Sequence, residues 1–161
     1  MTGEETIAAI AAGNLRNLFG GHWNLGDLIR FHTAHKLLLL AHSTVAYRQL
    51  GRLLAGGRSL TRHQLQDRYA DGFMRALEQP VTTGRHANVL QHMAGYFTHR
   101  LDPASARELA GTIEDFRRRL VPLAVPLALV RHHVRTLDVA YLAGQIYLQP
   151  HPKELMPRNH L

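Results

Sequence analysis

The sequence predicts an all-α protein, a single compact domain of six to eight helices. Apolar residues recur at helical spacing along most of the 161 residues, and helix-start signals precede many of these segments. β-branched residues are sparse and the alternation of apolar and polar residues is short-lived, so strands are not expected. With 45% hydrophobic residues, a chain of this length can bury a core of its own.

Most of the predicted helices in the first half begin at a residue whose side chain can accept a backbone hydrogen bond. These helices are expected at 4–19 with acidic residues in the first turn, from Asp27 as cap to about residue 42, at 44–55 capped by Ser43 or Thr44, and at 60–78 capped by Ser59. The GGHWNLG stretch at 20–26 and the pair Gly56-Gly57 are read as the breaks between them.

The second half continues in the same way, ending in a tail. Its helices are expected at 84–100 capped by Thr83, from Asp102-Pro103 to about residue 119, around 128–136 with a start left open by Pro122 and Pro126, and as a final short helix at 139–149. The proline-rich residues 150–161 are expected to lie over the surface. Residues 1–21 are interpreted as an N-terminal helix or extension, and residues 22–161 as the helical domain.

The composition excludes several classes of chemistry. Without cysteine, the chain cannot form disulfides, use a thiolate nucleophile or hold a cysteine-ligated metal or iron–sulfur cluster. The longest apolar run, 120–130, contains two prolines and is shorter than the ~20 residues of a membrane span. No signal peptide is visible, since Glu4 and Glu5 replace a basic start. We therefore expect a cytoplasmic protein without a membrane partner.

The positive charge is segregated along the chain. The formal net charge is +7, and the segments 28–66, 79–101 and 116–137 contain no acidic residue. Such blocks favour a polyanionic partner, because guanidinium groups bind phosphate oxygens in pairs. Arginines at the solvated or salt-bridged surface are the alternative. The expected phosphate contacts are Lys36, Arg48, Arg52, Arg58, Arg62, Arg85, Arg131 and Arg135, with Tyr47, Tyr69, Tyr96 and Trp23 as stacking surfaces for unpaired bases.

The stretch FHTAHKLLLLAHS (31–43) raises the question of a metal or catalytic site. On a helical wheel His35 and His42 fall among apolar residues, and no carboxylate lies nearby, so we predict buried histidines without a metal or other cofactor. A polar pocket formed by His32, His35 and His86 keeps open the hypothesis of a small histidine-containing enzyme, with or without a metal. No catalytic motif supports it, and an enzyme is the less favoured interpretation.

Three stretches in order resemble the YbgA family of bacterial proteins. They are GDLIRFHTAHKLLLLAHS (26–43), RHANVLQHMAGYF (85–97) and YLAGQIYLQPHPKELMPRNHL (141–161). In that family the domain occurs alone, and also as the C-terminal half of RudS proteins. The N-terminal half of RudS is a TudS-type iron–sulfur desulfidase, which removes sulfur from 4-thiouridine in tRNA, and the second domain is understood to help bind the tRNA.

The resemblance implies an accessory domain that binds tRNA, or other RNA, without desulfidase chemistry of its own. The chain departs from the fusion proteins because it has no cysteine for the cluster. A stand-alone domain of this kind is expected to have tRNA as its partner and a separate iron–sulfur desulfidase as a second one. The remaining alternative is a protein-interaction module that docks on such a desulfidase in trans.

Overall fold

The computed structural model describes residues 3–149, with side chains from Glu5 onward. The predicted all-α fold is confirmed, since these residues contain no strand. Eight of their nine α-helices have seven residues or more, and three short 3₁₀ helices (η) join them. In order the elements are α1 (Gly3–Phe19), α2 (Leu25–Ala34), α3 (Lys36–His42), α4 (Thr44–Ala55), η1 (Gly57–Ser59), α5 (Arg62–Glu78), α6 (Thr83–Gly95), η2 (Thr98–Arg100), α7 (Pro103–Arg117), α8 (Ala124–Thr136), α9 (Ala140–Ala143) and η3 (Ile146–Leu148).

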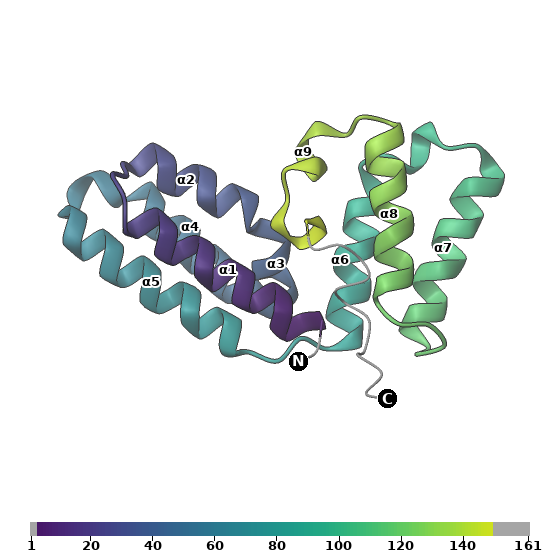
Figure 1. The fold of residues 1–161 in the computed structure, drawn as a ribbon, viewed down its shortest axis with the longest axis horizontal. Coiled ribbons are helices and arrows are strands. Elements are labelled where there is room, and N and C mark those ends of the chain that lie inside the picture. The colour runs from purple at the N-terminus through teal and green to yellow at the C-terminus, as the bar shows by residue number, and fades with distance from the viewer. Residues whose placement is uncertain (1–2, 150–161) are drawn as a thin grey trace.

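Two groups of helices lie at the two ends of an elongated molecule (Figure 1). Helices α1, α2, α4 and α5 run along the long axis and form the N-terminal lobe, while α6, α7 and α8 run across it and form the C-terminal lobe. Helices α3 and α9 lie between the lobes. None of the helices within residues 3–149 has the length and apolar character needed to cross a membrane.

The first helix contributes directly to the core of the N-terminal lobe. Ile7, Ala11 and Leu15 follow one another at four-residue spacing and are all buried. Through this face α1 packs against α5 and η3. The segment that was expected as an extension ahead of the main domain therefore adds side chains to the same apolar cluster.

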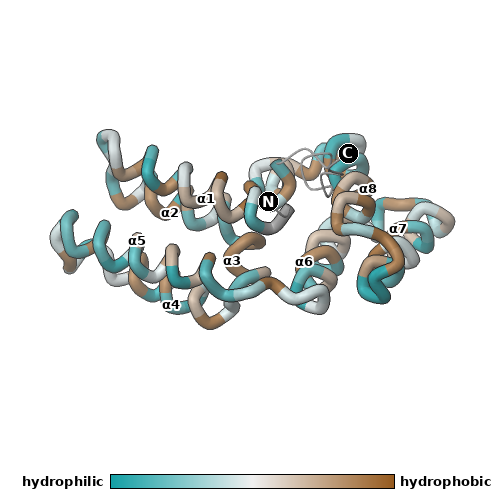
Figure 2. The backbone as a smooth tube through the Cα atoms, turned by 60° about the horizontal axis from the view of Figure 1, so that its bottom comes forward, coloured by the Kyte–Doolittle hydropathy of each residue, from teal (hydrophilic) through white to brown (hydrophobic). Residues whose placement is uncertain are grey.

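Helix α3 is the core element that the two lobes share. Its sequence KLLLLAH buries five of its seven residues, and it packs against α4 and α5 of one lobe and α6 of the other. In Figure 2 it is an apolar segment between the lobes. The prediction that His35 and His42 are buried is confirmed, since they are 2% and 4% exposed.

The prediction of one helix from Asp27 to about residue 42 is wrong, because the helix breaks at His35. In a continuous helix the Leu37 N–H would bond to the Thr33 carbonyl, four residues earlier. Here the Gln145 side chain occupies both places. Its Oε1 accepts from the Leu37 N–H at 3.2 Å, and its Nε2 donates to the Thr33 carbonyl at 2.8 Å. The carboxamide thus replaces the missing backbone bond and allows α3 to leave the direction of α2.

The C-terminal end of α3 is held by residues from α5 and α6. The His42 ring donates from Nδ1 to the carbonyl of Gln79, at the end of α5, over 2.8 Å. Arg85 of α6 donates from Nη1 to the carbonyl of His42 over 2.7 Å. A cation at this position satisfies a carbonyl that has no partner within its helix and opposes the negative end of the helix dipole. Both ends of α3 are therefore fixed by residues distant in sequence.

Several helix caps lie a few residues from their predicted positions. Asn24 caps α2, and Asp27 is the third helical residue, whose carboxylate accepts from the Asn24 N–H at 3.0 Å. This reciprocal capping box satisfies two backbone donors at once. The other displaced caps are Thr61 instead of Ser59 for α5 and Thr82 instead of Thr83 for α6, while Ser43 and Asp102 cap α4 and α7 as predicted.

The elements of the C-terminal lobe are mostly shorter than predicted. Helix α6 ends at Gly95, five residues before the expected end. Helix α8 begins at Ala124, with Pro126 in its first turn, where the missing proline N–H breaks no intrahelical bond. The predicted helix at 139–149 is two short pieces, α9 and η3. The expected surface course of 150–161 falls outside the described residues.

Replacing Gln145 by alanine should destabilise the protein by about 1–3 kcal/mol, because the buried Leu37 N–H would lose its partner. Gln145 is 1% exposed, so water cannot take over this role without opening the core. Urea unfolding monitored by circular dichroism measures the change. Gln91→Ala, on the exposed face of α6, is the matched control and should change stability little. Equal stability of the two variants would contradict the idea that the Gln145 side chain stabilises the break between α2 and α3.

Two helices end on a residue other than glycine in the left-handed conformation. Arg119 follows α7 with φ 61°, and Asp138 follows α8 with φ 53°. The Leu120 N–H then reaches back to the carbonyl of Asp115 at 2.9 Å. This Schellman turn usually uses glycine, since a side chain in that conformation costs roughly 1–2 kcal/mol.

Arg119→Gly should therefore stabilise the protein by about 0.5–1 kcal/mol, the strain relieved less the extra entropy that glycine loses on folding. Thermal and urea unfolding measure the gain. Arg118→Gly, one residue earlier at φ −81°, is the matched control and should lower stability, because no strain is relieved there. If both glycine substitutions destabilise, the strain explanation is wrong.

Candidate nucleic-acid interface

Four of the predicted phosphate contacts lie on one continuous stretch of structure. Arg48 and Arg52 are exposed on α4, 40° apart around the helix at ~100° per residue. Arg58 is exposed in η1, and Arg62 is the first residue of α5. The structure thus brings these four residues, here called the arginine segment, to the outer face of α4 and the turn that follows it.

The arginine segment has no acidic partner among the described residues, whereas other arginines do. No described carboxylate oxygen lies within the 4.0 Å ion-pair limit of its guanidinium groups. The pairs that do form are Arg30 with Asp27, Arg75 with Asp71 at 3.2 Å, and Glu114 with Arg117 at 3.5 Å and Arg118 at 3.2 Å. Arg62 nevertheless acts on Asp27 at longer range, since it helps to lower the pKa of that carboxyl, whereas no such influence is seen for Arg48, Arg52 and Arg58 among the described residues.

Two cations of the predicted set lie over aromatic rings. The Arg62 guanidinium is 4.7 Å from the centroid of Trp23, and the Lys36 Nζ is 5.8 Å from the centroid of Tyr47. Such cation–π contacts restrict a long side chain while leaving its charge available. They place Lys36 beside the start of α4, next to the arginine segment.

The remaining predicted contacts lie elsewhere. Arg85 is used inside the fold, since its Nη1 donates to the His42 carbonyl at the end of α3. Arg131 and Arg135 lie on α8 in the other lobe, where they line a cavity of about 430 Å³ together with Asp138. The predicted set therefore divides into three places and does not form one surface patch around a single element.

The predicted polar pocket of three histidines is divided between the lobes. His32 forms a hydrogen bond from Nδ1 to the Tyr69 hydroxyl at 3.0 Å, and its ring stacks on Tyr47 with centroids 4.9 Å apart. His35 donates from Nδ1 to the Phe31 carbonyl at 2.7 Å. His86 instead bonds to the Tyr147 hydroxyl of η3. All three histidines are buried, as predicted for core residues.

Burial sets the protonation of the aromatic cluster formed by His32, His35 and Tyr69. It lowers the pKa of His32 to about 4, with a smaller contribution from the neighbouring His35. The pKa of His35 is also lowered by burial, although its bond to the Phe31 carbonyl opposes that effect. The pKa of Tyr69 is raised by burial and by the nearby Tyr47. At neutral pH the cluster is therefore uncharged, and it belongs to the core.

Two of the predicted stacking residues are wrong. Tyr69 is 0% exposed and Trp23 is 5% exposed, so neither ring can meet a base. Tyr96 is exposed as required and stacks on Tyr141, with ring centroids 5.3 Å apart. Tyr141 was missed because the helix predicted over 139–149 gave no reason to bring it beside residue 96. Tyr141 does, however, lie in the YLAGQIYL stretch, one of the three stretches that carry the family resemblance, and this could have marked it as a candidate.

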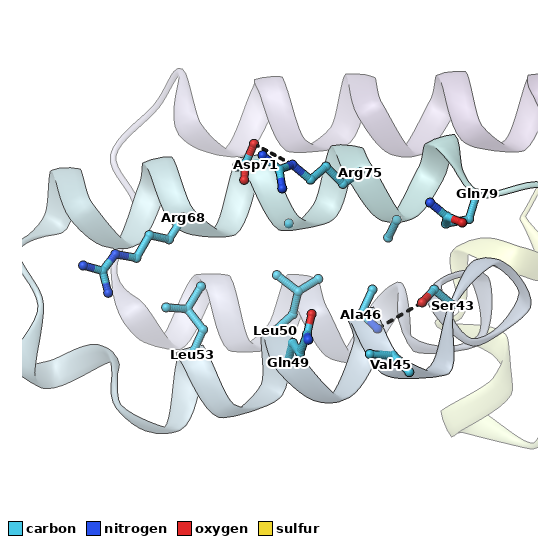
Figure 3. A pocket seen from close by; sticks show the side chains of 12 residues that line it. Ser43, Val45, Ala46, Gln49, Leu50, Leu53, Arg68, Asp71, Arg75 and Gln79 are labelled. Carbon is cyan, nitrogen blue, oxygen red and sulfur yellow. Dashed lines mark hydrogen bonds and ion pairs between the residues drawn. The ribbon is translucent and has the colours of Figure 1, made fainter.

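A groove of about 370 Å³ lies between α4 and α5 (Figure 3). Leu50 and Leu53 of α4 line one wall, and Arg68 and the ion pair between Asp71 and Arg75 line the other. The helices approach closely at Gly72, where an added Cβ would lie 2.8 Å from Leu50 Cδ2. The groove combines apolar surface with a positively charged edge.

No metal centre is present among residues 3–149, where no three histidine, aspartate or glutamate side chains converge. Along one face of α5, His63 Nε2 lies 3.1 Å from Asp67 Oδ2, and Asp71 forms an ion pair with Arg75. The described residues thus offer charged surface and a groove as their distinct chemical features.

These features define a small, basic, all-α protein with exposed arginines. The family model described as "Protein of unknown function (DUF1722)" matches residues 36–152. The protein named "Uncharacterized protein YbgA" from Escherichia coli K12 is 33% identical over 140 residues, which cover 83% of this chain and 80% of that protein. The chain therefore belongs to the DUF1722 family of YbgA-like proteins. No solved structure matches it.

Stability should fall as the pH drops from about 6.5 to 4, because the unfolded chain then binds protons that folded His32 and His35 resist. Above pH 6.5 the contribution is fully present. The His32 shift corresponds to roughly 3 kcal/mol for a fully buried group, and its residual solvent contact reduces the expected loss to about 2 kcal/mol. Urea unfolding at a series of pH values measures it.

His32→Phe should flatten that pH profile, even though loss of the Tyr69 bond lowers stability at every pH. The exposed His99, replaced by glutamine, serves as the matched control and should keep the profile of the unmodified protein. An unchanged slope in the His32→Phe protein would contradict the assigned protonation of His32.

Proposed function

We propose that this protein binds tRNA, or another RNA, as an accessory domain without desulfidase chemistry of its own. The observation that carries the proposal is the arginine segment: four basic side chains that lie along α4, η1 and the start of α5 without a carboxylate partner among the described residues. Guanidinium groups so placed suit the phosphates of a nucleic acid backbone.

The geometry of α4 suits contact along a backbone. Arg48 and Arg52 are one helical turn apart, ~6 Å along the axis, which is close to the spacing of successive phosphates. Lys36, held over Tyr47, adds a further cation beside them. Phosphate contacts of this kind position a protein on RNA without reading its sequence. We therefore expect the protein to bind RNA of varied sequence, and not to recognise one short sequence motif.

The choice of tRNA rests on the resemblance to the second domain of 4-thiouridine desulfidases. The chain has no cysteine, so any sulfur chemistry would belong to a separate iron–sulfur desulfidase that acts on the bound RNA. In this proposal the protein works in the cytoplasm, where tRNA is modified. Its contribution is to hold the substrate and not to transform it.

The groove between α4 and α5 favours a second candidate, a module that docks on such a desulfidase in trans. Val45, at its edge, is 62% exposed, and Leu50 and Leu53 line it beside Arg68. An acidic amphipathic segment would meet both the apolar wall and the positive edge. Co-purification of a cysteine-containing desulfidase, abolished by Val45→Asp, would support this candidate, and a lone monomer in the same experiment would count against it.

Binding of bulk tRNA should be detectable at ~50 mM salt and weaken steeply towards ~200 mM, because each neutralised phosphate releases counterions. The double variant Arg48→Gln, Arg52→Gln should weaken binding about tenfold or more at low salt and reduce the slope of log affinity against log salt by about 1–2. Fluorescence anisotropy with labelled tRNA measures both quantities.

The matched control is the double variant Arg117→Gln, Arg118→Gln. It removes the same net charge, but from arginines that share Glu114 on α7. It should weaken binding much less than the α4 variant does. Absence of binding by the unmodified protein at ~50 mM salt would sink the proposal, and equal effects of the two variants would show a response to net charge alone.

A further inference from the structure

Two exposed tyrosines form a stacked pair at the junction of the lobes. Tyr96, at the end of α6, is 38% exposed, and Tyr141 of α9 is 37% exposed. Their ring centroids are 5.3 Å apart and the planes are inclined by 26°. Among the described residues these are the only tyrosine, phenylalanine or tryptophan side chains classed as exposed. We call this pair the tyrosine platform.

The platform is held in a fixed place by the core beneath it. Each tyrosine is followed along the chain by a fully buried residue, Phe97 after Tyr96 and Leu142 after Tyr141, both 0% exposed. The ring of His92, one turn earlier on α6, meets Tyr96 edge-on with centroids 5.6 Å apart. The two rings therefore have little freedom to collapse onto other apolar surface.

The platform has Tyr47, at the start of α4, as a neighbour. The pKa of Tyr141 is raised by partial burial and then by the neighbouring phenol groups of Tyr96 and Tyr47. Tyr47 directly precedes Arg48 on α4, and Lys36 lies over its ring. A cation, Lys36, therefore lies over the ring of a tyrosine that neighbours the platform. The carboxylate nearest in sequence, Asp138, instead lines the cavity of Arg131 and Arg135.

We propose that the tyrosine platform stacks an unpaired nucleobase of RNA whose backbone follows the arginine segment. This inference rests on the proposed function and adds to it the class of RNA: a loop or single-stranded end, because a base within a duplex presents no free face to a side chain. Stacking on aromatic rings is the usual way in which proteins hold splayed RNA bases, and it tolerates any base.

The experiment compares a labelled 12-nucleotide oligoadenylate with a 12-base-pair RNA duplex at fixed low salt. Tyr96→Leu, Tyr141→Leu keeps apolar bulk over the core but removes the stacking surface. It should weaken oligoadenylate binding about 5- to 100-fold, in line with the loss of stacking with one base, and change duplex binding less than twofold. Tyr96→Phe, Tyr141→Phe keeps the rings and should bind oligoadenylate as the unmodified protein does.

Two controls separate this inference from the proposal on which it rests. Leu120→Ala removes another exposed apolar side chain, 69% exposed, and should affect neither RNA. Arg48→Gln, Arg52→Gln should weaken both RNAs. If the leucine variant binds both RNAs as tightly as the unmodified protein, or loses both equally, the platform is wrong while phosphate binding stands. If the unmodified protein binds neither RNA, both proposals fall.

Discussion

The fold depends on the Gln145 carboxamide, which fills a gap in the backbone hydrogen bonds between α2 and α3. The Gln145 side chain completes the hydrogen bonds of Thr33 and Leu37 where the chain would otherwise run on as a single helix. A continuous α2–α3 helix would carry the apolar KLLLLAH segment straight on from the N-terminal lobe. The break turns this segment into the space between the lobes, where five of its seven residues are buried. The stretch at residues 31–43 and the stretch around residue 145 are thus joined directly, through the hydrogen bonds of Gln145 to Thr33 and Leu37.

The buried histidines follow from the same arrangement. Imidazole can pack as an aromatic ring and still satisfy a backbone group, which leucine cannot do. His35, at the break, donates to the Phe31 carbonyl and stacks on the Phe31 ring with centroids 3.9 Å apart. His42, at the other end of α3, holds the last turn of α5 through the Gln79 carbonyl. Both residues thus make polar contacts at the two ends of α3 within an otherwise apolar core.

The sequence was sufficient for the fold class and for most of the interior. Helical spacing identified the helices, and the wheel placed His35, His42 and Leu38 inside. It could not show the break at His35, because nothing local to residues 31–43 interrupts the helical pattern; the cause is a side chain 108 residues away. The boundaries moved for a related reason: Asn24 with Asp27, and Thr61 with Gln64, form reciprocal caps that outcompete the single caps predicted nearby.

The sequence predicted which basic residues could lie at the surface, but only partly how they are arranged there. Arg48 and Arg52, in the acid-free segment 28–66, have no ion pair with a described carboxylate, whereas Arg30 of the same segment pairs with Asp27 just outside it. Arg85 belongs to an equally acid-free segment, yet it is turned onto the His42 carbonyl, because a helix end needed a donor there. Trp23 and Tyr69 were assigned to the surface by residue type, but α1, α2 and α5 enclose them.

The two hydrogen bonds of the Gln145 side chain also affect the order in which the chain can fold during its synthesis. The two groups that this side chain joins are made early, and residue 145 is made more than a hundred residues later. Until that segment has left the ribosome, the turn between α2 and α3 lacks its partner, and the leucines of α3 lack their cover from η3. Contacts so distant in sequence slow the search for the native state. In a nascent N-terminal half, α4 and α5 can cover part of α3, while the side that packs against α6 and η3 stays uncovered until those segments are made.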